Sequence, residues 1–283
     1  MKKDTVDNIV RLALKEDIAT GDITTNLLIP KEKISRGYIV LKENAIVCGL
    51  SIAEKTLKRL EPNAVFRRFC KDGDFVKKDS KIVAIKGHTR ALLTGERVML
   101  NFLGYLSGIA THTNVFVKKV SPYKVKILDT RKTTPGLRRL EKYAVQCGGG
   151  YNHRFDLAEM VLIKDNHRQA CQRKMTIEET VRFVKKRTKK TIEVETDNFS
   201  QFQQALKANP DIIMLDNMGT KQMKKAVQVV KKLKSKRKPL IEASGGISLK
   251  NVRSVAKTGV DLISIGMLTH SQKNINISME LID

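Results

Sequence analysis

The sequence has no tryptophan, few other aromatic residues and a shortage of acidic side chains. Aromatic residues make up 5% of the 283 residues, which argues against a platform on which nucleic-acid bases stack. The 29 acidic residues are outnumbered by 54 lysines and arginines, which gives a formal net charge of +25. Such a charge suits nucleic acid, an anionic membrane surface or anionic metabolites. Composition alone leaves these three partners open.

Cysteine is also scarce, and apolar runs are short. The four cysteines form no C-x-x-C pair and have no histidine at metal-ligand spacing, so we expect reduced thiols. The N-terminus leads into a helical pattern with Glu16 and Asp17 and not into a long apolar core. No apolar run is long enough to cross a bilayer. We therefore expect a cytoplasmic protein with no membrane partner.

Most of the excess lysine gathers in two runs, 185–190 and 231–238, each at the outer end of an amphipathic helical pattern. Charge runs in this position usually form a solvated helix face. We therefore expect no nucleic-acid partner, although a nucleic-acid-binding module remains the alternative of a different class. Steep salt dependence of binding to unrelated DNA would favour that alternative.

The first part of the chain has the pattern of a small α+β domain. Helical spacing of apolar residues covers 4–17, 51–60 and 90–120, and strand-like runs cover 37–47, 64–69 and 81–86. The polar, turn-rich segment 16–25 reads as a loop. Gly104 and Gly108 interrupt the longest helical pattern and predict either close packing or a break.

After residue 120 strand-like and helical segments alternate, which implies a parallel sheet with right-handed crossovers. Six such units could form an open doubly wound sheet or a closed barrel, and periodicity does not choose between them. The expected strands are 125–128, 160–163, 191–194, 212–215, 239–241 and 262–265, and the expected helices are 136–146, 177–187, 199–207, 219–233 and 249–257.

Charged or small residues end nearly every expected strand. The carboxyl ends of such strands converge on one face, where loop-borne chemistry is usually found, so this set predicts an active site. Its cationic members suit carboxylates or phosphates: Arg131, Lys132, Arg154, Lys164 and one of Arg138 and Arg139. Glu195 and Asp216 are oxygen ligands that suit hydrated Mg²⁺.

Two glycine-containing turns predict a phosphate site. Ser244-Gly245-Gly246 precedes Ser248 at an expected helix start, and Gly266 follows the next strand. Among the histidines near these loops, His153 and His270 could donate to a substrate or cap the backbone, whereas capping is favoured for His167. No nucleophile stands beside a base, so the pattern indicates catalysis by positioning and electrostatic stabilisation.

Together these residues resemble one enzyme family, quinolinate phosphoribosyltransferase (decarboxylating). The resemblance covers nearly the whole chain in order and is carried by Glu16-Asp17, Gly21-Asp22-Ile23-Thr24, Asp129-Thr130-Arg131-Lys132-Thr133, Gly148-Gly149-Gly150, Asn152-His153-Arg154, Ile163-Lys164-Asp165-Asn166-His167, Glu193-Val194-Glu195, Leu215-Asp216-Asn217, Ala243-Ser244-Gly245-Gly246-Ile247, Gly266 and Thr269-His270. It implies that quinolinate and phosphoribosyl pyrophosphate give nicotinate mononucleotide, pyrophosphate and CO₂ with Mg²⁺, in de novo NAD biosynthesis.

The resemblance also implies a fold that periodicity did not give. It predicts an α/β protein with an open, incomplete, six-stranded β/α barrel at 116–271 and an N-terminal α/β sandwich-like domain at 1–115. The tail 272–283 is expected to pack back on the first domain. Members are homodimers or larger dimer-based assemblies in which an arginine of the partner completes each site. Arg97, otherwise an ordinary surface charge, matches that arginine.

The family motifs imply a role for each predicted site residue. Arg97, Arg131, Arg154 and Lys164 would bind the two quinolinate carboxylates. Thr130, His153 and His270 would line the same site, and Lys132 would lie between quinolinate and the sugar donor. Glu195 and Asp216 would contact the ribose hydroxyls and the metal, and the 5-phosphate would be held by Ser244, Gly245, Gly246 and Gly266. The nearest rival is a phosphoribosyltransferase-like protein from molybdenum-transport gene clusters, which the full basic set disfavours.

Overall fold

The computed structural model describes residues 3–171, 174–235 and 237–282, and these divide into two compact units. The N-terminal unit contains the chain through Asn114, the segment Thr134–Gly149 and the tail from Ser271. The barrel unit contains Val115–Thr133 and Gly150–His270. The whole of 116–271 was predicted to form the barrel domain, whereas the structure groups 134–149 with the N-terminal residues.

The N-terminal unit is built on a four-stranded antiparallel sheet of order β12-β1-β5-β3, with β2 and β4 paired separately. Its elements are α1 (Lys3–Ile18), α2 (Ile23–Leu28), β1 (Ile34–Leu41), β2 (Ala45–Ile46), α3 (Leu50–Leu60), β3 (Val65–Arg68), β4 (Phe75–Val76), β5 (Lys81–His88), α4 (Thr89–Val120), α5 (Arg138–Cys147) and β12 (Ile277–Ile282). Helix α4 continues past Asn114 into the residues of the barrel unit.

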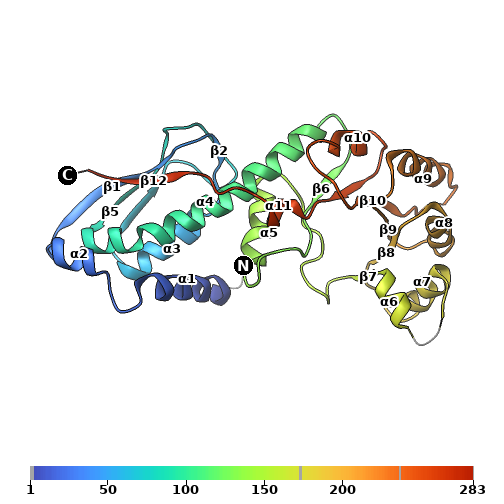
Figure 1. The fold of residues 1–283 in the computed structure, drawn as a ribbon, viewed down its shortest axis with the longest axis horizontal. Helices are drawn as coiled ribbons and strands as arrows, with labels where there is room; N and C mark the ends of the chain where they lie inside the picture. Colours follow the sequence, from blue (N-terminus) through green and yellow to red (C-terminus); the bar gives the residue numbers. More distant parts are fainter. Residues whose placement is uncertain (1–2, 172–173, 236, 283) are drawn as a thin grey trace. The chain divides into compact units, whose positions relative to one another are not determined.

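Helices α3 and α4 lie beside the antiparallel sheet (Figure 1), and their apolar side chains share one core with it. Leu50, Ala53 and Leu57 recur at helical spacing on α3 and are fully buried, as are Leu92 and Leu103 of α4. Each fully buried leucine side chain stabilises the fold by roughly 1.5–3 kcal/mol. The tail returns to this sheet, because β12 pairs with β1 from Arg36↔Ile282 to Leu41↔Ile277.

Glycine lets that tail approach α4. A Cβ atom on Gly108 would lie 2.2 Å from the carbonyl oxygen of Lys273, and one on Gly104 would lie 2.8 Å from that of Ile275. Helix α4 runs through both glycines without a break, so close packing is the reason for them. The loop prediction for 16–25 was wrong at both ends. Helix α1 continues to Ile18, and Asp22 accepts a hydrogen bond from the Thr25 N–H and starts α2.

The barrel unit is built on six parallel strands in the order β6-β11-β10-β9-β8-β7, which confirms the predicted fold class. Strands β6 and β7 are the two ends of this order, so the barrel is open. The elements of this unit are β6 (Lys126–Leu128), β7 (Val161–Ile163), α6 (Asp165–Ala170), α7 (Ile177–Lys185), β8 (Ile192–Thr196), α8 (Phe199–Ala208), β9 (Ile212–Asp216), α9 (Thr220–Lys232), β10 (Leu240–Ser244), α10 (Val252–Ala256), β11 (Leu262–Ser264) and α11 (Met267–His270).

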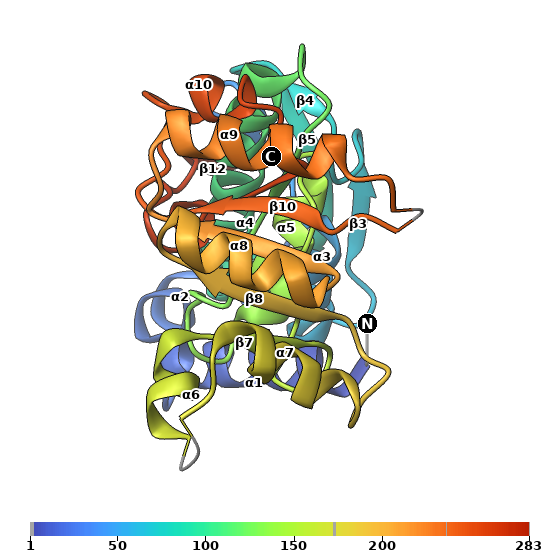
Figure 2. The same ribbon diagram turned by 90° about the vertical axis from the view of Figure 1, so that its right-hand side faces the viewer.

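Helices α7, α8 and α9 lie side by side on the outer face of the parallel sheet (Figure 2). Phe202 and Ala205 of α8 and Met223 and Val227 of α9 are buried against it. The described lysines of the runs 185–190 and 231–238 are exposed, as expected of a solvated face. Within the described ranges, no helix combines the length and the apolar character needed to cross a membrane.

Candidate active site

The carboxyl ends of the parallel strands surround a cavity of about 750 Å³ in the barrel unit. The site residues predicted at the strand ends line it: Thr130, Arg131, Lys132, His153, Arg154, Lys164, Glu195, Asp216, Ser244, Gly245, Gly246, Gly266 and His270. The predicted contribution of Arg138 or Arg139 was wrong, because both lie at the start of α5 in the N-terminal unit and neither lines the cavity. Parallel pairing explains this convergence, because Ser244 is in register with Asp216 and Ser264 with Leu128. Arg97 lies on α4 in the N-terminal unit, where its side chain is exposed.

Two arginines supply a fixed cationic wall. Arg154 is only 8% exposed, and its guanidinium donates to the carbonyl oxygen of Met160 at 3.2 Å. Burial lowers the pKa of Arg154, and the nearby Arg131 lowers it further. The Nε atom of Arg131 is buried and has no hydrogen-bond partner in the described part of the chain. Two neighbouring guanidinium groups attract an anion, so this wall suits a carboxylate-bearing ligand.

Two lysines stand at the mouth of the same cavity. Lys164 follows β7, and its Nζ atom lies 2.7 Å from Oε2 of Glu195. Lys132 follows β6 in a turn in which its backbone N–H donates to Thr130 Oγ1 at 3.0 Å. Thr269 donates its hydroxyl to the Lys132 carbonyl oxygen at 2.6 Å. The backbone of Lys132 is therefore held from both β6 and α11, while its side chain remains at the cavity wall.

Carboxylates gather at the ends of β8 and β9. Oxygen atoms of Glu195, Asp197 and Asp216 lie within 4.8 Å of one another. Asn217 has a left-handed backbone conformation, with φ of 52°, and donates its side-chain amide to Asp216 Oδ2 at 2.8 Å. Such a group of oxygen donors suits a hard divalent cation. Asp197, which directly follows β8, was not among the predicted site residues.

The glycine turn after β10 leaves room for an oxyanion. Gly245 has φ of 87°, and a Cβ atom on it would lie 2.2 Å from Asn217 Oδ1. At Gly246, φ is 59°, and a Cβ atom on this residue would have no neighbour within 4 Å among the described residues. The predicted helix start at Ser248 was wrong: α10 begins at Val252, and the Ser248 N–H donates to Asn251 Oδ1 at 2.8 Å. The backbone of 244–246, and not a helix end, forms this side of the cavity.

His153 faces the protein interior with both ring nitrogens. Its Nδ1 atom accepts from the Arg154 N–H at 2.8 Å, and its Nε2 atom lies 2.9 Å from Oε2 of Glu193. Glu242 lies on the neighbouring side, 3.7 Å from the same nitrogen. Both glutamates are fully buried, and burial, with the charge of Glu193, raises the pKa of Glu242 to about 8. His153 therefore acts through Arg154, whose backbone it holds.

The role of Glu193 was missed in the sequence, although a signal for it was present. In a strand, residues two apart point to the same side, so Glu193 and Glu195 share one face. Glu242 and Ser244 repeat this pattern on β10.

The other two histidines predicted near the site differ from each other. His167 accepts from the Lys164 N–H at 3.0 Å and caps α6, as expected, whereas His270 lines the cavity.

Comparison with known proteins identifies the family. The model of the C-terminal domain of quinolinate phosphoribosyl transferase matches residues 109–280, and the model of its N-terminal domain matches residues 22–107. The chain belongs to the quinolinate phosphoribosyl transferase family. The two matches follow each other without overlap and take in the whole cavity, so the family resemblance covers the site as well as the fold.

Relatives of similar length carry this family's names. A probable nicotinate-nucleotide pyrophosphorylase (carboxylating) from Methanocaldococcus jannaschii is 40% identical, and the match covers 100% of this chain and 99% of the relative. The nicotinate-nucleotide pyrophosphorylase (carboxylating) of Mycobacterium leprae is 38% identical over 98% of each chain. The solved structure of the nicotinate-nucleotide pyrophosphorylase from Francisella tularensis superimposes with a TM-score of 0.93 at 40% identity, covering 100% of this chain and 98% of that one.

Proposed function

We propose that this protein transfers the phosphoribosyl group of phosphoribosyl pyrophosphate to quinolinate and releases pyrophosphate and CO₂. The product is nicotinate mononucleotide, a precursor in de novo NAD biosynthesis. One observation carries the proposal: a single cavity joins a wall of buried arginine, a glycine turn open to an oxyanion and a group of carboxylates. These three parts match a dicarboxylate, a phosphate and a ribose with its metal.

The cations of the cavity bind and orient quinolinate in this proposal. Arg131 and Arg154 pair with its carboxylates, with bidentate geometry available to both. Lys164 joins them, held in place by Glu195 at 2.7 Å. The ring nitrogen is thereby directed at the ribose carbon that carries pyrophosphate, and Lys132 stabilises the negative charge of the departing group. The positive ring nitrogen then makes loss of the adjacent carboxylate favourable, because the carbanion formed lies next to it.

We further propose that Asp216 and Glu195 would hold Mg²⁺ beside the bound ribose. When bound, the ion neutralises the charge that develops on pyrophosphate as it leaves. Lys164 bonds one oxygen of Glu195 and Asn217 bonds one oxygen of Asp216, so each carboxylate keeps a second oxygen for a ligand. The glycine turn of 244–246, with Gly266 on the other side, holds the 5-phosphate. Free cysteines favour a cytoplasmic location for this activity.

A homodimer would complete the site with Arg97 of the partner. The segment before α2 is tied to the helix that carries Arg97, because Asp22 Oδ2 accepts from the Thr94 hydroxyl at 3.1 Å, three residues before Arg97 on α4. Asp22 also starts α2, which exposes Ile23 to 75% and Leu27 to 79%. Exposed apolar side chains in this number mark a surface that another protein covers. The surface beside Arg97 therefore suits a second copy of the chain.

Incubation of the purified protein with quinolinate, phosphoribosyl pyrophosphate and Mg²⁺ tests the activity. We expect equal amounts of nicotinate mononucleotide and CO₂, measured by chromatography and by release of label from the 2-carboxyl group. Nicotinate, which lacks that carboxyl, serves as the control substrate and should react far more slowly. A folded protein that forms no product from quinolinate would refute the proposed function.

Complementation between two inactive variants tests the shared site. Arg97→Ala should abolish activity because it removes one cation from every cavity, and Lys164→Ala should do the same within the barrel unit. A mixed dimer, however, contains one cavity with both residues intact. We expect mixing under subunit exchange to restore roughly a quarter of the wild-type activity. No recovery despite exchange proven by differently tagged subunits would place Arg97 outside the active site.

A further inference from the structure

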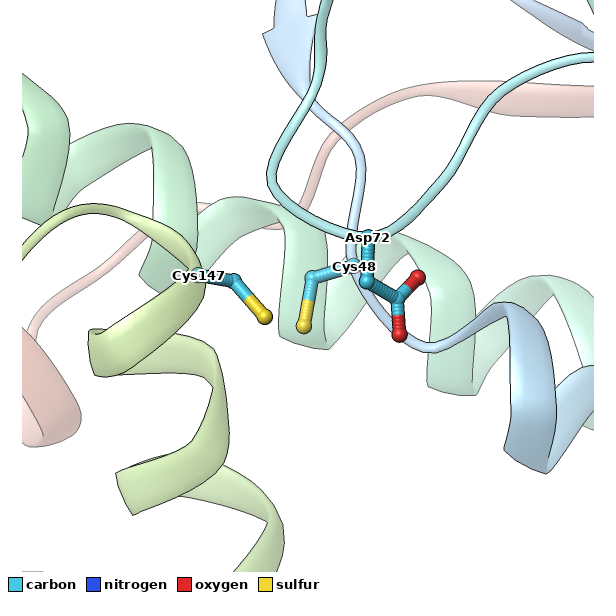
Figure 3. A group of neighbouring side chains, drawn as sticks. All are labelled: Cys48, Asp72 and Cys147. Atoms are coloured by element: carbon cyan, nitrogen blue, oxygen red, sulfur yellow. The ribbon is translucent and has the colours of Figure 1, made fainter.

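Two cysteines that are far apart in sequence point their sulfur atoms toward each other in the N-terminal unit (Figure 3). Cys48 follows β2, and Cys147 is the last residue of α5. Their Sγ atoms and a carboxylate oxygen of Asp72 lie within 4.8 Å of one another. No step of the proposed reaction uses these three residues, which lie in a different unit from the cavity.

Helix α4 fixes the backbone of both cysteines. Ser107 accepts from the Cys48 N–H at 2.9 Å and donates its hydroxyl to the Cys48 carbonyl oxygen at 3.2 Å. Gly148, next to Cys147, packs so closely that a Cβ atom on it would lie 2.3 Å from the carbonyl oxygen of Ala110. Ser107 and Ala110 are three residues apart on one helix face. The approach of the two sulfur atoms is therefore imposed by a rigid element.

Asp72 braces the pair from the other side. Its Oδ1 atom accepts from the backbone N–H groups of Gly49 and Leu50, at 3.0 Å and 3.1 Å, at the start of α3. Its Oδ2 atom accepts from the Tyr143 hydroxyl at 2.8 Å, one turn before Cys147 on α5. The carboxylate thus ties the chain beside Cys48 to the helix that carries Cys147. Because its lone pairs already serve these donors, Asp72 is better suited to holding the two cysteines in place than to binding a metal.

The two thiols are not equivalent. Cys48 is fully buried, whereas Cys147 is partly exposed and can meet a small molecule from solvent. A hydrogen bond from Cys48 lowers the pKa of Cys147, and the same contact, together with burial, raises the pKa of Cys48. The thiolate is the form that attacks an oxidant. Cys147 is accordingly the reactive member, and Cys48 is the thiol in position to resolve its first oxidation product.

We propose that Cys147 and Cys48 form a reversible disulfide when hydrogen peroxide, or another two-electron peroxide oxidant, reaches Cys147. The Cys147 thiolate attacks one peroxide oxygen, the O–O bond breaks, and a sulfenic acid and hydroxide form. The Cys48 sulfur then attacks the Cys147 sulfur, the S–O bond breaks, and water leaves with the Cys48 proton. In total two thiols and one peroxide give one disulfide and two waters, and a small dithiol reverses the change.

Formation of the disulfide would cross-link residues 48 and 147 and so close a long loop of the chain. A cross-link of this span restricts the unfolded chain and should raise the melting temperature by roughly 5–15 °C. This inference concerns the N-terminal unit alone and does not rest on the proposed catalytic activity. It can therefore be tested on the full chain whether or not that activity is found.

The test is peroxide titration of the reduced full-length protein in the presence of a chelator. We expect two of the four thiols to disappear, a mass loss of two hydrogen atoms, and a Cys48–Cys147 cross-linked peptide after digestion. Dithiothreitol should restore both thiols. Cys70→Ser is the matched control: it removes another partly buried cysteine of the same unit and should leave the cross-link intact.

A second variant separates the two steps. Cys48→Ser should stop the reaction at the sulfenic acid of Cys147, which dimedone traps, and should remove the rise in melting temperature. Should Cys48→Ser fail to fold, the peptide map of the wild-type protein decides the question by itself. The proposal is overturned if peroxide leaves both thiols intact, if the cross-link joins other cysteines, or if dimedone labels Cys48 instead of Cys147. It is also overturned if the pair takes up Zn²⁺ stoichiometrically and forms no disulfide after the metal is removed.

Discussion

Replacing Glu242 by glutamine tests how the barrel unit keeps two carboxylates buried beneath its cavity. Burial and the neighbouring Glu193 raise the pKa of Glu242 from 4.5 to about 8. The folded state therefore keeps a proton that the unfolded state releases above about pH 4.5. The stability that this group contributes is fully present below that pH and is lost as the pH rises towards about 8.

The size of the effect follows from the shift. One pKa unit corresponds to about 1.4 kcal/mol, so the wild-type protein should lose about 3 kcal/mol of unfolding free energy between about pH 5 and about pH 7 through this group alone. Glutamine has the shape of the protonated side chain and does not titrate. We expect Glu242→Gln to resemble the wild type near pH 5 and to be more stable by about 3 kcal/mol near pH 7.

Urea unfolding followed by circular dichroism at several pH values measures this difference. Groups that titrate in both proteins contribute equally to the pH dependence of the two unfolding free energies. The difference between the two proteins therefore reports the contribution of Glu242. Glu193→Gln is the matched control, because it alters the other buried carboxylate, 2.9 Å from His153 Nε2. It removes the charge that faces His153 and Arg154, so we expect loss of stability at every pH. A difference between wild type and Glu242→Gln that does not change with pH would refute the reasoning.

Two further predictions concern the arginine wall and the packing of the tail. Arg154→Lys should lower kcat/KM for quinolinate by roughly 10–100-fold, because lysine cannot contact the Met160 carbonyl oxygen and a substrate carboxylate in the same planar arrangement. Gly108→Ala should destabilise the N-terminal unit by about 2–4 kcal/mol, since its Cβ atom would meet the Lys273 carbonyl oxygen at 2.2 Å. Gly219→Ala, with nothing within 4 Å, is the control for thermal denaturation and should be nearly neutral.

The alternation of strands and helices could be predicted from the sequence because each parallel strand is a short apolar run between amphipathic helices. The residues that end these strands were predictable for the same reason, and they line one cavity. Element ends were less predictable. The start of α2 depends on a hydrogen bond that the Asp22 carboxylate accepts from the Thr25 N–H, and a turn-rich sequence gives little sign of it. Helix α10 begins later than predicted, because the Ser248 N–H donates to the side chain of Asn251.

Contacts between distant segments could not be predicted from local patterns. The pairing of β12 with β1 joins residues more than 230 positions apart, and no periodicity near residue 280 indicates it. The grouping of Thr134–Gly149 with the N-terminal unit is of the same kind. Tyr105 of α4 donates to Glu141 Oε1 of α5 at 2.5 Å, which ties that segment to the unit's longest helix. Such contacts depend on which distant segments meet in the folded chain. Patterns within neighbouring residues carry no information about that.

The buried glutamates also explain how the cavity can remain attractive to anions. Two ionised carboxylates directly beneath Arg154 and His153 would cancel much of the positive potential that a dicarboxylate substrate needs. A proton held on Glu242 reduces the negative charge there, while Glu193, 2.9 Å from His153 Nε2, orients the ring so that Nδ1 accepts from the Arg154 N–H. We therefore expect substrate binding and protonation of Glu242 to be coupled. The Glu242→Gln variant, which keeps that neutral form permanently, should hold quinolinate at alkaline pH where the wild type begins to lose it.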